Sequence, residues 1–410
     1  MPSIDNLLRD ELKRVTDTVQ PGQLRPLWIP APGHRWRRRL LPLAAAAAVI
    51  AVAVSAVLVA GPKLTPVPAA APVTAAVPRH YLTFTFVPDK QFHDLPVTEA
   101  VIRDTASGKI TGTVKITTKS FPASVAADAA SDGRSFILAI AENAPKDEYR
   151  FFRLPVSASG KPGHLTEFPA YPVPVNAYLA GIALSPDGTR LAVSFSYGLG
   201  ATNSGPAKYM VGAVEVINLV TGTVRTWTAT MQQGHWYQPG QPSWADGNRM
   251  IAFTWQQAKS MSNNAMTMEG VRLLDTTAPG NNLADARMIM PKKAVSGTIN
   301  SVLITPDGRD VLVATSRNSH GTVLVQISEV PTAGAGPVRV LRTETARATA
   351  TTQGTLSASG QVLSLAPGGR YALVQCIQFG WLDLDSGRFT PLPAHSPTPP
   401  GQIAIIYGVW

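Results

Sequence analysis

The sequence is poor in cysteine and comparatively poor in charge. Its 410 residues include one cysteine, Cys376, which excludes an intrachain disulfide, and a lone thiol cannot form a zinc cluster. At the end of an apolar segment, Cys376 is expected to behave as a small buried hydrophobic residue. Charged residues make up 15% of the chain, below the usual share, whereas 45% are hydrophobic, which is ample for a large core.

Motifs of the common catalytic and metal sites are also missing. The seven histidines show neither HxH nor HExxH spacing, and no GxSxG elbow or Gly-rich phosphate loop occurs. We therefore expect no metal, no cofactor and no enzymatic activity. A pair of carboxylates that assembles in space would leave no such motif, so an enzyme of that kind stays an alternative.

The net charge of +10 does not come from a concentrated basic surface. Four arginines lie within residues 35–39, but the rest of the chain has only a thin excess of basic residues and no basic run. Nucleic-acid binding normally needs a basic patch or stripe. We therefore predict no nucleic-acid partner.

One long apolar segment, Leu40–Ala60, has 21 residues without a charge. A helix of this length crosses a hydrocarbon core of roughly 30 Å. The arginines at 35–39 precede it and only Lys63 follows closely, so the positive-inside rule places residues 1–39 in the cytoplasm and the rest outside. We predict a single-pass protein of the cell membrane. The alternative is a cleaved secretory signal.

Residues 3–19 have the periodicity of a short amphipathic helix that Pro21 and Gly22 terminate. A lone helix of this length is marginal in water, so its apolar stripe is expected to contact a cytoplasmic protein, a second copy or the inner membrane surface. The alternative is a partly folded stub. The residues of the stripe are Ile4, Leu7, Leu8, Leu12, Val15 and Val19.

A phrase recurs through the second half of the chain: LSPDGTRLAVSF at 184–195, ITPDGRDVLVAT at 304–315 and SLAPGGRYALVQC at 364–376, with looser copies at 129–140 and 243–255. Each copy reads as an apolar strand, a Gly turn and a second strand. The turn positions are spaced by 55, 59, 61 and 61 residues, and they are Asp132, Asp187, Asp246, Asp307 and Gly368. All-β units at such a period indicate a propeller.

A second strand pair follows each of these hairpins, which gives four antiparallel strands per unit. A sixth unit is expected from residues 81–116, with the missing strand supplied by the terminal residues 401–410. We predict an all-β fold, a six-bladed β-propeller with seven blades as the alternative, over residues 79–410. A Pro/Ala-rich spacer at 61–78 joins it to the transmembrane helix at 40–60 and to the cytoplasmic segment 1–39.

The repeated phrase resembles the TolB-like, or WD40-like, propeller repeat, whose core is SPDG followed by apolar alternation. Residues 185–188 match this core, 305–308 read TPDG, and 367–369 keep only PGG. No GH…WD pair recurs, so the chain departs from strict WD40 repeats. The resemblance implies the fold. Together with the predicted span it is similar to membrane-anchored propeller proteins of high-GC Gram-positive bacteria, which implies no mechanism.

Long loops at 197–209, 231–243 and 256–270 are expected on one face of the ring. Aromatic and methionine side chains among uncharged polar groups are typical of recognition surfaces. The alternative is that the aromatic residues pack between blades; for Trp255, which ends a strand, we favour packing. The predicted binding surface consists of His235, Trp236, Tyr237, Met261, Met266 and Met268.

Two functions follow from these patterns. The first is a binding, scaffold or sensing module, with an envelope protein or a glycan as its ligand outside the cell. The second is a hydrolase or lyase that acts on a glycan or lactone in the channel of the propeller. The second requires carboxylates or a metal that converge near the axis, and a channel lined by apolar and amide side chains would contradict it.

Overall fold

A computed structural model describes part of the chain. The chain divides into two units, Met1–Thr65 and Pro66–Trp410, and all the described residues belong to the second. The described residues are 76–86, 97–116, 125–142, 148–168, 177–199, 209–229, 236–260, 263–332, 334, 336–347, 360–393 and 403–409.

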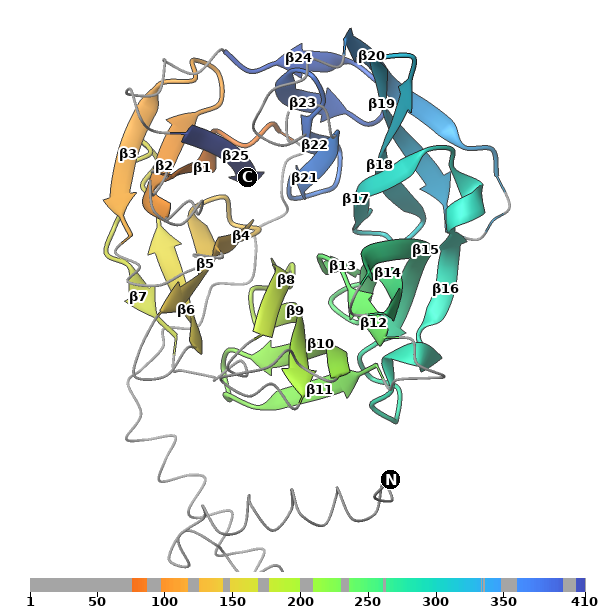
Figure 1. Ribbon diagram of the computed structural model, residues 1–410. Helices are drawn as coiled ribbons and strands as arrows, with labels where there is room; N and C mark the ends of the chain where they lie inside the picture. The colour runs from red at the N-terminus through yellow and green to blue at the C-terminus, as the bar shows by residue number, and fades with distance from the viewer. Residues whose placement is uncertain are drawn as a thin grey trace, which may run out of the picture. The chain divides into compact units, whose positions relative to one another are not determined.

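Six antiparallel sheets are arranged around a common axis, which confirms the six-bladed β-propeller (Figure 1). We number the blades 1 to 6 in the order β1–β3, β4–β7, β8–β11, β12–β16, β17–β20 and β21–β24. The innermost strands of the six blades are β25 (Ile403–Val409), β4 (Val125–Ala129), β8 (Ala177–Leu184), β12 (Trp236–Pro239) with β13 (Ser243–Ala245), β17 (Thr298–Ile304) and β21 (Gln361–Leu365).

Three further strands complete each blade toward the outside. The second strands are β1 (His80–Phe86), β5 (Ser135–Glu142), β9 (Arg190–Leu199), β14 (Met250–Ser260), β18 (Asp310–Ser319) and β22 (Tyr371–Gln375). The third strands are β2 (Val97–Asp104), β6 (Glu148–Pro155), β10 (Tyr209–Asn218), β15 (Asn263–Asp275), β19 (Thr322–Pro331) and β23 (Phe379–Asp383). The outermost are β3 (Ile110–Lys115), β7 (Thr166–Glu167), β11 (Val224–Thr228), β16 (Arg287–Pro291), β20 (Arg339–Arg347) and β24 (Phe389–Pro391).

Blade 1 is built from both ends of the propeller sequence. Strand β25 pairs with β1 in antiparallel register, for example Phe84 with Ile405, and so forms the innermost strand that the first unit lacks. The prediction that residues 401–410 complete this unit is confirmed. Closing the ring in this way removes the exposed sheet edges that an open array of blades would leave.

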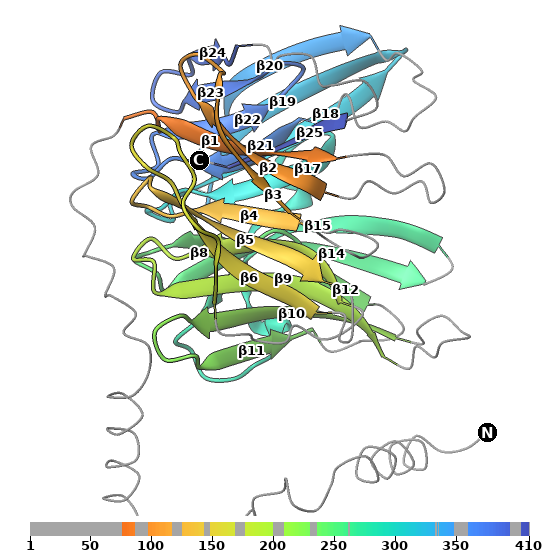
Figure 2. The same ribbon diagram turned by 90° about the vertical axis from the view of Figure 1, so that its left-hand side faces the viewer.

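The repeated DG turns have a structural role. The carboxylate of Asp187 accepts hydrogen bonds from the Ser185 hydroxyl (2.6 Å) and the Thr189 N–H (3.0 Å), and Gly188 has φ of +70°. Asp accepts such local bonds readily, and Gly adopts positive φ without a steric penalty. We call the side of the ring with these turns the DG face. The chain enters β1 from this side, where the Arg79 carbonyl accepts from the Thr105 N–H at 2.8 Å (Figure 2).

The cores lie between blades. Among the described residues there are six apolar clusters, each made by two neighbouring blades. A blade is therefore covered on both faces, and consecutive residues of a second strand are buried together. In β18, Val311, Leu312, Val313 and Ala314 all have no exposed surface.

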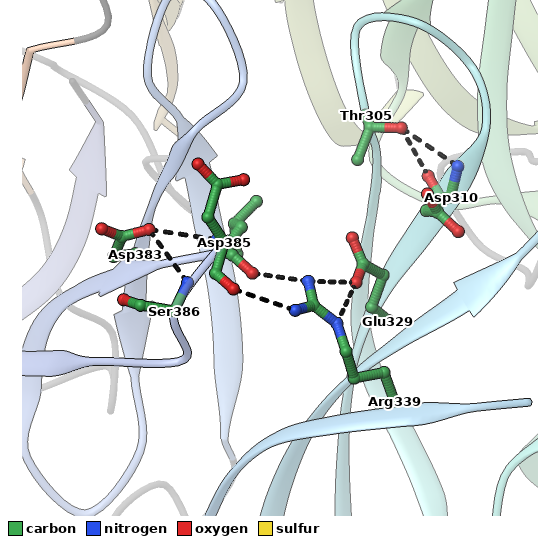
Figure 3. Close-up of polar contacts among 8 residues, drawn as sticks. Thr305, Asp310, Glu329, Arg339, Asp383, Asp385 and Ser386 are labelled. Carbon is green, nitrogen blue, oxygen red and sulfur yellow. Dashed lines mark hydrogen bonds and ion pairs between the residues drawn. The ribbon is translucent and has the colours of Figure 1, made fainter.

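Arginines on outer strands join neighbouring blades. Arg339 of β20 donates hydrogen bonds to the carbonyls of Leu384 (2.5 Å) and Asp385 (3.2 Å) in the outer turn of blade 6 (Figure 3). Its Nε donates to Glu329 of its own blade at 2.6 Å. Arg225 of β11 contacts the outer turn of blade 4 in the same way, through the Thr276 carbonyl at 2.7 Å. These arginines hold the blades in register at the circumference.

The predicted N-terminal elements lie outside the described residues. These are the helix at 3–19, with Ile4, Leu7, Leu8, Leu12, Val15 and Val19, and the span at 40–60. The part of the chain that the structure describes contains no helix of the length and apolarity needed to cross a bilayer. Both elements stay predictions.

Candidate functional site

Two cavities lie along the axis of the ring. The lower cavity, of about 360 Å³, is near the DG face and is lined by Asp128 and by residues of the inner strands of blades 3 to 6. The upper cavity, of about 740 Å³, is near the other ends of the same inner strands. Gln241 and Leu363 line both cavities, so the two are neighbours along the channel.

The described residues that line the upper cavity carry uncharged side chains. Its described lining includes no Asp, Glu, Lys, Arg or His. Hydroxyl groups come from Ser196, Ser301 and Thr254, and aromatic rings from Tyr178 and Trp236. The five amide side chains are Gln238, Gln241, Gln256, Asn300 and Gln361.

Irregularities in the inner strands place residues in the channel. The pairing of β8 with β9 shifts at Ala180, that of β17 with β18 at Asn300, and that of β21 with β22 at Leu363. In blade 4 the inner strand is interrupted between β12 and β13, where Gln241 lies. A β-bulge bends its strand and redirects the extra side chain. All four of these residues line the upper cavity.

Three residues of this lining have buried polar atoms without a hydrogen-bond partner in the described structure. They are the Ser196 hydroxyl, the Trp236 indole N–H and the Asn300 side-chain NH₂. The carbonyl oxygen of the same Asn300 side chain accepts from the Ser316 hydroxyl at 3.3 Å. Leaving such a group unpaired costs about 1–3 kcal/mol, so each one needs a physical explanation.

The lower cavity contains the one carboxylate among the described residues that line the two cavities. Asp128 Oδ2 accepts from the Leu184 N–H at 2.6 Å. Burial raises the pKa of Asp128 to about 7, although backbone N–H groups oppose this shift. The described residues include no group of three His, Cys, Asp or Glu side chains that could hold a metal ion. A single carboxylate is not the pair that glycoside hydrolysis requires.

The predicted surface residues have different positions. Trp236 is on β12, opposite Ala258 of β14, and lines the upper cavity. Tyr237 is on the other face of β12 and packs into the cluster between blades 3 and 4. There it stacks on Trp255, with ring centroids 4.8 Å apart. Trp255 is 1% exposed, and the Arg272 guanidinium lies 4.8 Å from its ring centroid, so the packing role that we favoured is confirmed.

The predicted methionines and the histidine are not among the described residues that line the two cavities. Met268 packs against the cluster between blades 4 and 5. Met266 is in β15, opposite Ala258, and its side chain is outside the described part; Met261 and His235 are outside the described residues altogether. The predicted loop at 256–270 is largely a β14–β15 hairpin, because cross-strand pairing continues to Ser260 and Asn263. This hairpin projects from the side opposite the DG face (Figure 2).

Sequence reasoning missed the amides. Gln238, Gln241, Gln256, Asn300 and Gln361 come from three blades and share no motif. Four of them lie in or beside inner strands that are interrupted, and Gln256 lies on the second strand β14. This pattern identifies a site only after the fold shows which strands lie next to one another.

Other sequence candidates have ordinary structural roles. Asp383 accepts from Arg370 at 3.0 Å and from two backbone N–H groups in its turn. Glu215 accepts from the Thr226 hydroxyl at 3.1 Å, and burial raises the pKa of its carboxyl. Burial raises the pKa of the Cys376 thiol to about 12, in agreement with a buried hydrophobic residue.

Comparisons with known proteins provide little beyond this geometry. No protein-family model matches the chain, and no curated protein matches it. Among solved structures, hydrazine synthase of Kuenenia stuttgartiensis is 15% identical, over 79% of this chain and 81% of that chain, with a TM-score of 0.39. Periplasmic gluconolactonase of Pseudomonas aeruginosa is 15% identical, over 75% and 81%, also with 0.39. A polysaccharide lyase, an ulvan lyase, is 10% identical, over 73% and 71%, with 0.42. Similarity at this level carries no inference about activity.

Proposed function

We propose that this protein is a binding, scaffold or sensing module of the cell envelope, with its ligand site in the upper cavity. The propeller is held outside the cell by one membrane span at 40–60, and residues 1–39 are in the cytoplasm. The uncharged segment and the arginines at 35–39 support this topology. The resemblance of the DG hairpins to TolB-like repeats supports a place among membrane-anchored propellers.

The composition of the upper cavity is the observation that carries the proposal. A cavity of about 740 Å³ is large enough for a small ligand, and ligand sites combine apolar or aromatic walls with a few polar groups. Three buried polar atoms in its lining lack partners. Because these atoms have almost no accessible surface, a bound polar molecule would supply their hydrogen bonds after the side chains rotate toward the cavity.

The alternative is a hydrolase or lyase that acts on a glycan or lactone in the channel. Acid–base chemistry of that kind needs a positioned acid and base, most often two carboxylates. The described lining contains one, Asp128, at the other end of the channel from the larger cavity. This composition favours binding over catalysis.

On the cytoplasmic side, the stripe of residues 3–19 is proposed to contact a protein or a second copy of the chain. This contact would couple the ligand site to the cell interior. Crosslinking of intact cells, with Leu8→Asp as the variant that interrupts the stripe, tests it. The wild-type chain is expected to form an adduct that the variant loses.

Two experiments test the proposed membrane anchor and the proposed ligand site outside the cell. Membranes washed with alkaline carbonate should retain the full chain, whereas a chain without residues 40–60 should appear in the soluble fraction. A wild-type chain found in the supernatant would contradict the anchor.

The second experiment fills the cavity. Ala180 lies at the bulge of β8, so Ala180→Trp places a large ring in the upper cavity. The full chain is screened by saturation-transfer NMR against neutral saccharides, uncharged peptides and anionic polymers. We expect one class to bind the wild-type chain and not the filled variant. Equal binding to both chains, or no binding by any class, would refute a ligand site in this cavity.

A further inference from the structure

The amide side chains in the upper cavity restrict the ligand that it suits. Each amide carries an NH₂ donor and a carbonyl acceptor side by side. Blade 4 supplies Gln238, Gln241 and Gln256, blade 5 supplies Asn300, and blade 6 supplies Gln361. A matching ligand presents donors and acceptors in alternation over its whole surface. Neighbouring hydroxyl groups of a sugar ring do so, since each hydroxyl is both a donor and an acceptor.

The missing charge restricts the ligand further. A carboxylate, phosphate or ammonium group that leaves water for this cavity would find no opposite charge among the described lining residues. Burying an unpaired charge is strongly unfavourable. The ligand class is therefore uncharged, which sets aside acidic polysaccharides and phosphorylated polymers.

Two aromatic residues belong to the apolar part of the site, beside aliphatic side chains such as Val302 and Leu363. Tyr178, on β8, is 60% exposed, and Trp236, on β12, is half-buried; both line the upper cavity. The face of an aromatic ring is electron-rich, and aliphatic C–H groups carry a weak positive charge. The C–H faces of a pyranose ring therefore pack on aromatic faces while its hydroxyl groups pair with amides.

The unpartnered polar groups also favour a ligand with many oxygen atoms. Trp236 and Asn300 each have a buried donor without an acceptor, and Ser196 has a hydroxyl that can donate and accept. A ligand rich in oxygen acceptors, with hydroxyl donors as well, meets this combination after small side-chain rotations.

An uncharged peptide is the competing ligand, and the strand geometry disfavours it. Extended peptides commonly bind by adding a strand to an open sheet edge. Among the described residues, the inner edges that line the upper cavity are those of blades 3 to 6, and each is interrupted, at Ala180, Gln241, Asn300 and Leu363. A bulge breaks the row of backbone donors and acceptors that such a peptide needs.

We propose that the upper cavity binds a neutral oligosaccharide, with the amides of blades 4 to 6 on its hydroxyl groups and Tyr178 and Trp236 on its ring faces. This proposal rests on the proposed function, because it names the ligand class of the same cavity.

Neighbouring residues of β14 provide a matched pair of variants. Gln256 lines the upper cavity, whereas Gln257, on the other face of the strand, donates to the Tyr237 hydroxyl at 3.4 Å between blades 3 and 4. Gln256→Ala and Gln257→Ala remove the same atoms from adjacent positions. Only the first change touches the proposed site.

The experiment measures binding to the full chain in a detergent without a sugar headgroup. The probes are chitotriose, cellotriose and maltotriose, with trigalacturonic acid as the charged control and a blocked trialanine peptide as the uncharged peptide control. Tryptophan fluorescence and saturation-transfer NMR report binding. We expect at least one neutral trisaccharide to bind, Gln256→Ala to weaken it by about tenfold, and Gln257→Ala to leave it within about twofold.

Each other outcome overturns the inference in a distinguishable way. Binding of the peptide or of trigalacturonic acid without any neutral trisaccharide, and with sensitivity to Gln256→Ala, refutes the sugar and leaves the cavity as a binding site. Trisaccharide binding that responds equally to both glutamine variants refutes this location. No binding by any probe, together with a screen in which no ligand class binds the wild-type chain, refutes the ligand class and the proposed function together.

Discussion

The lower and upper cavities share the inner strands of blades 3 to 6, yet their polar side chains differ in whether they have hydrogen-bond partners. In the lower cavity, Trp244 donates its indole N–H to the Ala183 carbonyl at 2.9 Å, and the Ser243 hydroxyl accepts from the Ile304 N–H at 3.2 Å. In the upper cavity, the indole N–H of Trp236 and the hydroxyl of Ser196 have no hydrogen-bond partner in the described structure.

This difference suggests separate roles for the two ends of the channel: polar groups at one end hold the blades together, and polar groups at the other end are available to a ligand. At the DG face, polar side chains bridge one blade to the next, so they contribute to the stability of the ring. Toward the other face, the Trp236 indole N–H and the Ser196 hydroxyl are unpaired in the described structure, whereas the Ser301 hydroxyl still bridges two blades by accepting from the Val362 N–H at 2.6 Å. Polar groups that a fold buries and does not satisfy are concentrated at functional sites more often than elsewhere. The comparison can be tested with matched variants at the two ends.

The tryptophans should give the largest contrast. Trp244 is 5% exposed and belongs to the cluster between blades 3 and 4, so Trp244→Ala is expected to lower the free energy of unfolding by about 3–5 kcal/mol. Trp236→Ala, at a half-buried position, should cost roughly 1 kcal/mol. Urea unfolding followed by circular dichroism measures both. Equal losses would remove the distinction between the two ends.

Asp128 should make the lower cavity sensitive to pH. Its pKa is raised from 3.8 to about 7 in the folded protein, so the folded state holds a proton that the unfolded state releases. The free energy of unfolding therefore falls as the pH rises from about 4 to 7. Asp128→Asn keeps an acceptor for the Leu184 N–H and cannot ionise, so at pH 8 it should be more stable than the wild type by on the order of 2 kcal/mol.

Unfolding measured at pH 5 and at pH 8 checks this. The stability difference between variant and wild type should shrink at pH 5. A difference that does not change with pH would show that Asp128 ionises normally. The described lining of the upper cavity contains no Asp, Glu or His, so ligand binding there should stay constant over the same range.

The serines should give the smallest contrast. Ser243→Ala removes the acceptor of the Ile304 N–H and should cost about 1 kcal/mol, because it leaves a buried donor unpaired. Ser196→Ala deletes a hydroxyl that is 1% exposed and unpartnered, so its effect should be within a few tenths of a kcal/mol or slightly stabilising. Thermal melts compare the two, and a larger loss for Ser196→Ala would mean that its hydroxyl has a structural partner.

The fold could be predicted from the sequence because its repeats encode local geometry. The DG turns at Asp132, Asp187, Asp246 and Asp307 each specify one hairpin, and their spacing sets one blade. Blade 1 has no such turn, but the apolar pattern of residues 81–116 and of the terminal strand was sufficient. These signals are local, so single-sequence reasoning captures them.

The candidate site could be predicted only in part. Trp236 was found because it is conspicuous in a polar segment, whereas its neighbour Tyr237 faces the other way. Side-chain direction alternates along a strand, so the placement of β12 decides between them. The amides were missed because their convergence depends on three blades and on bulges that no short motif specifies.

The position of β25 has a consequence for how the protein is made. A ribosome produces blades 2 to 6 before residues 403–409, and every strand of those blades has its partners in already synthesised chain. Blade 1 must wait, with β1 lacking an inner neighbour, until residues 403–409 have been made. Assembly of the ring is therefore a late event, and chaperones of the compartment in which it happens would meet a row of five finished blades with one unfinished sheet.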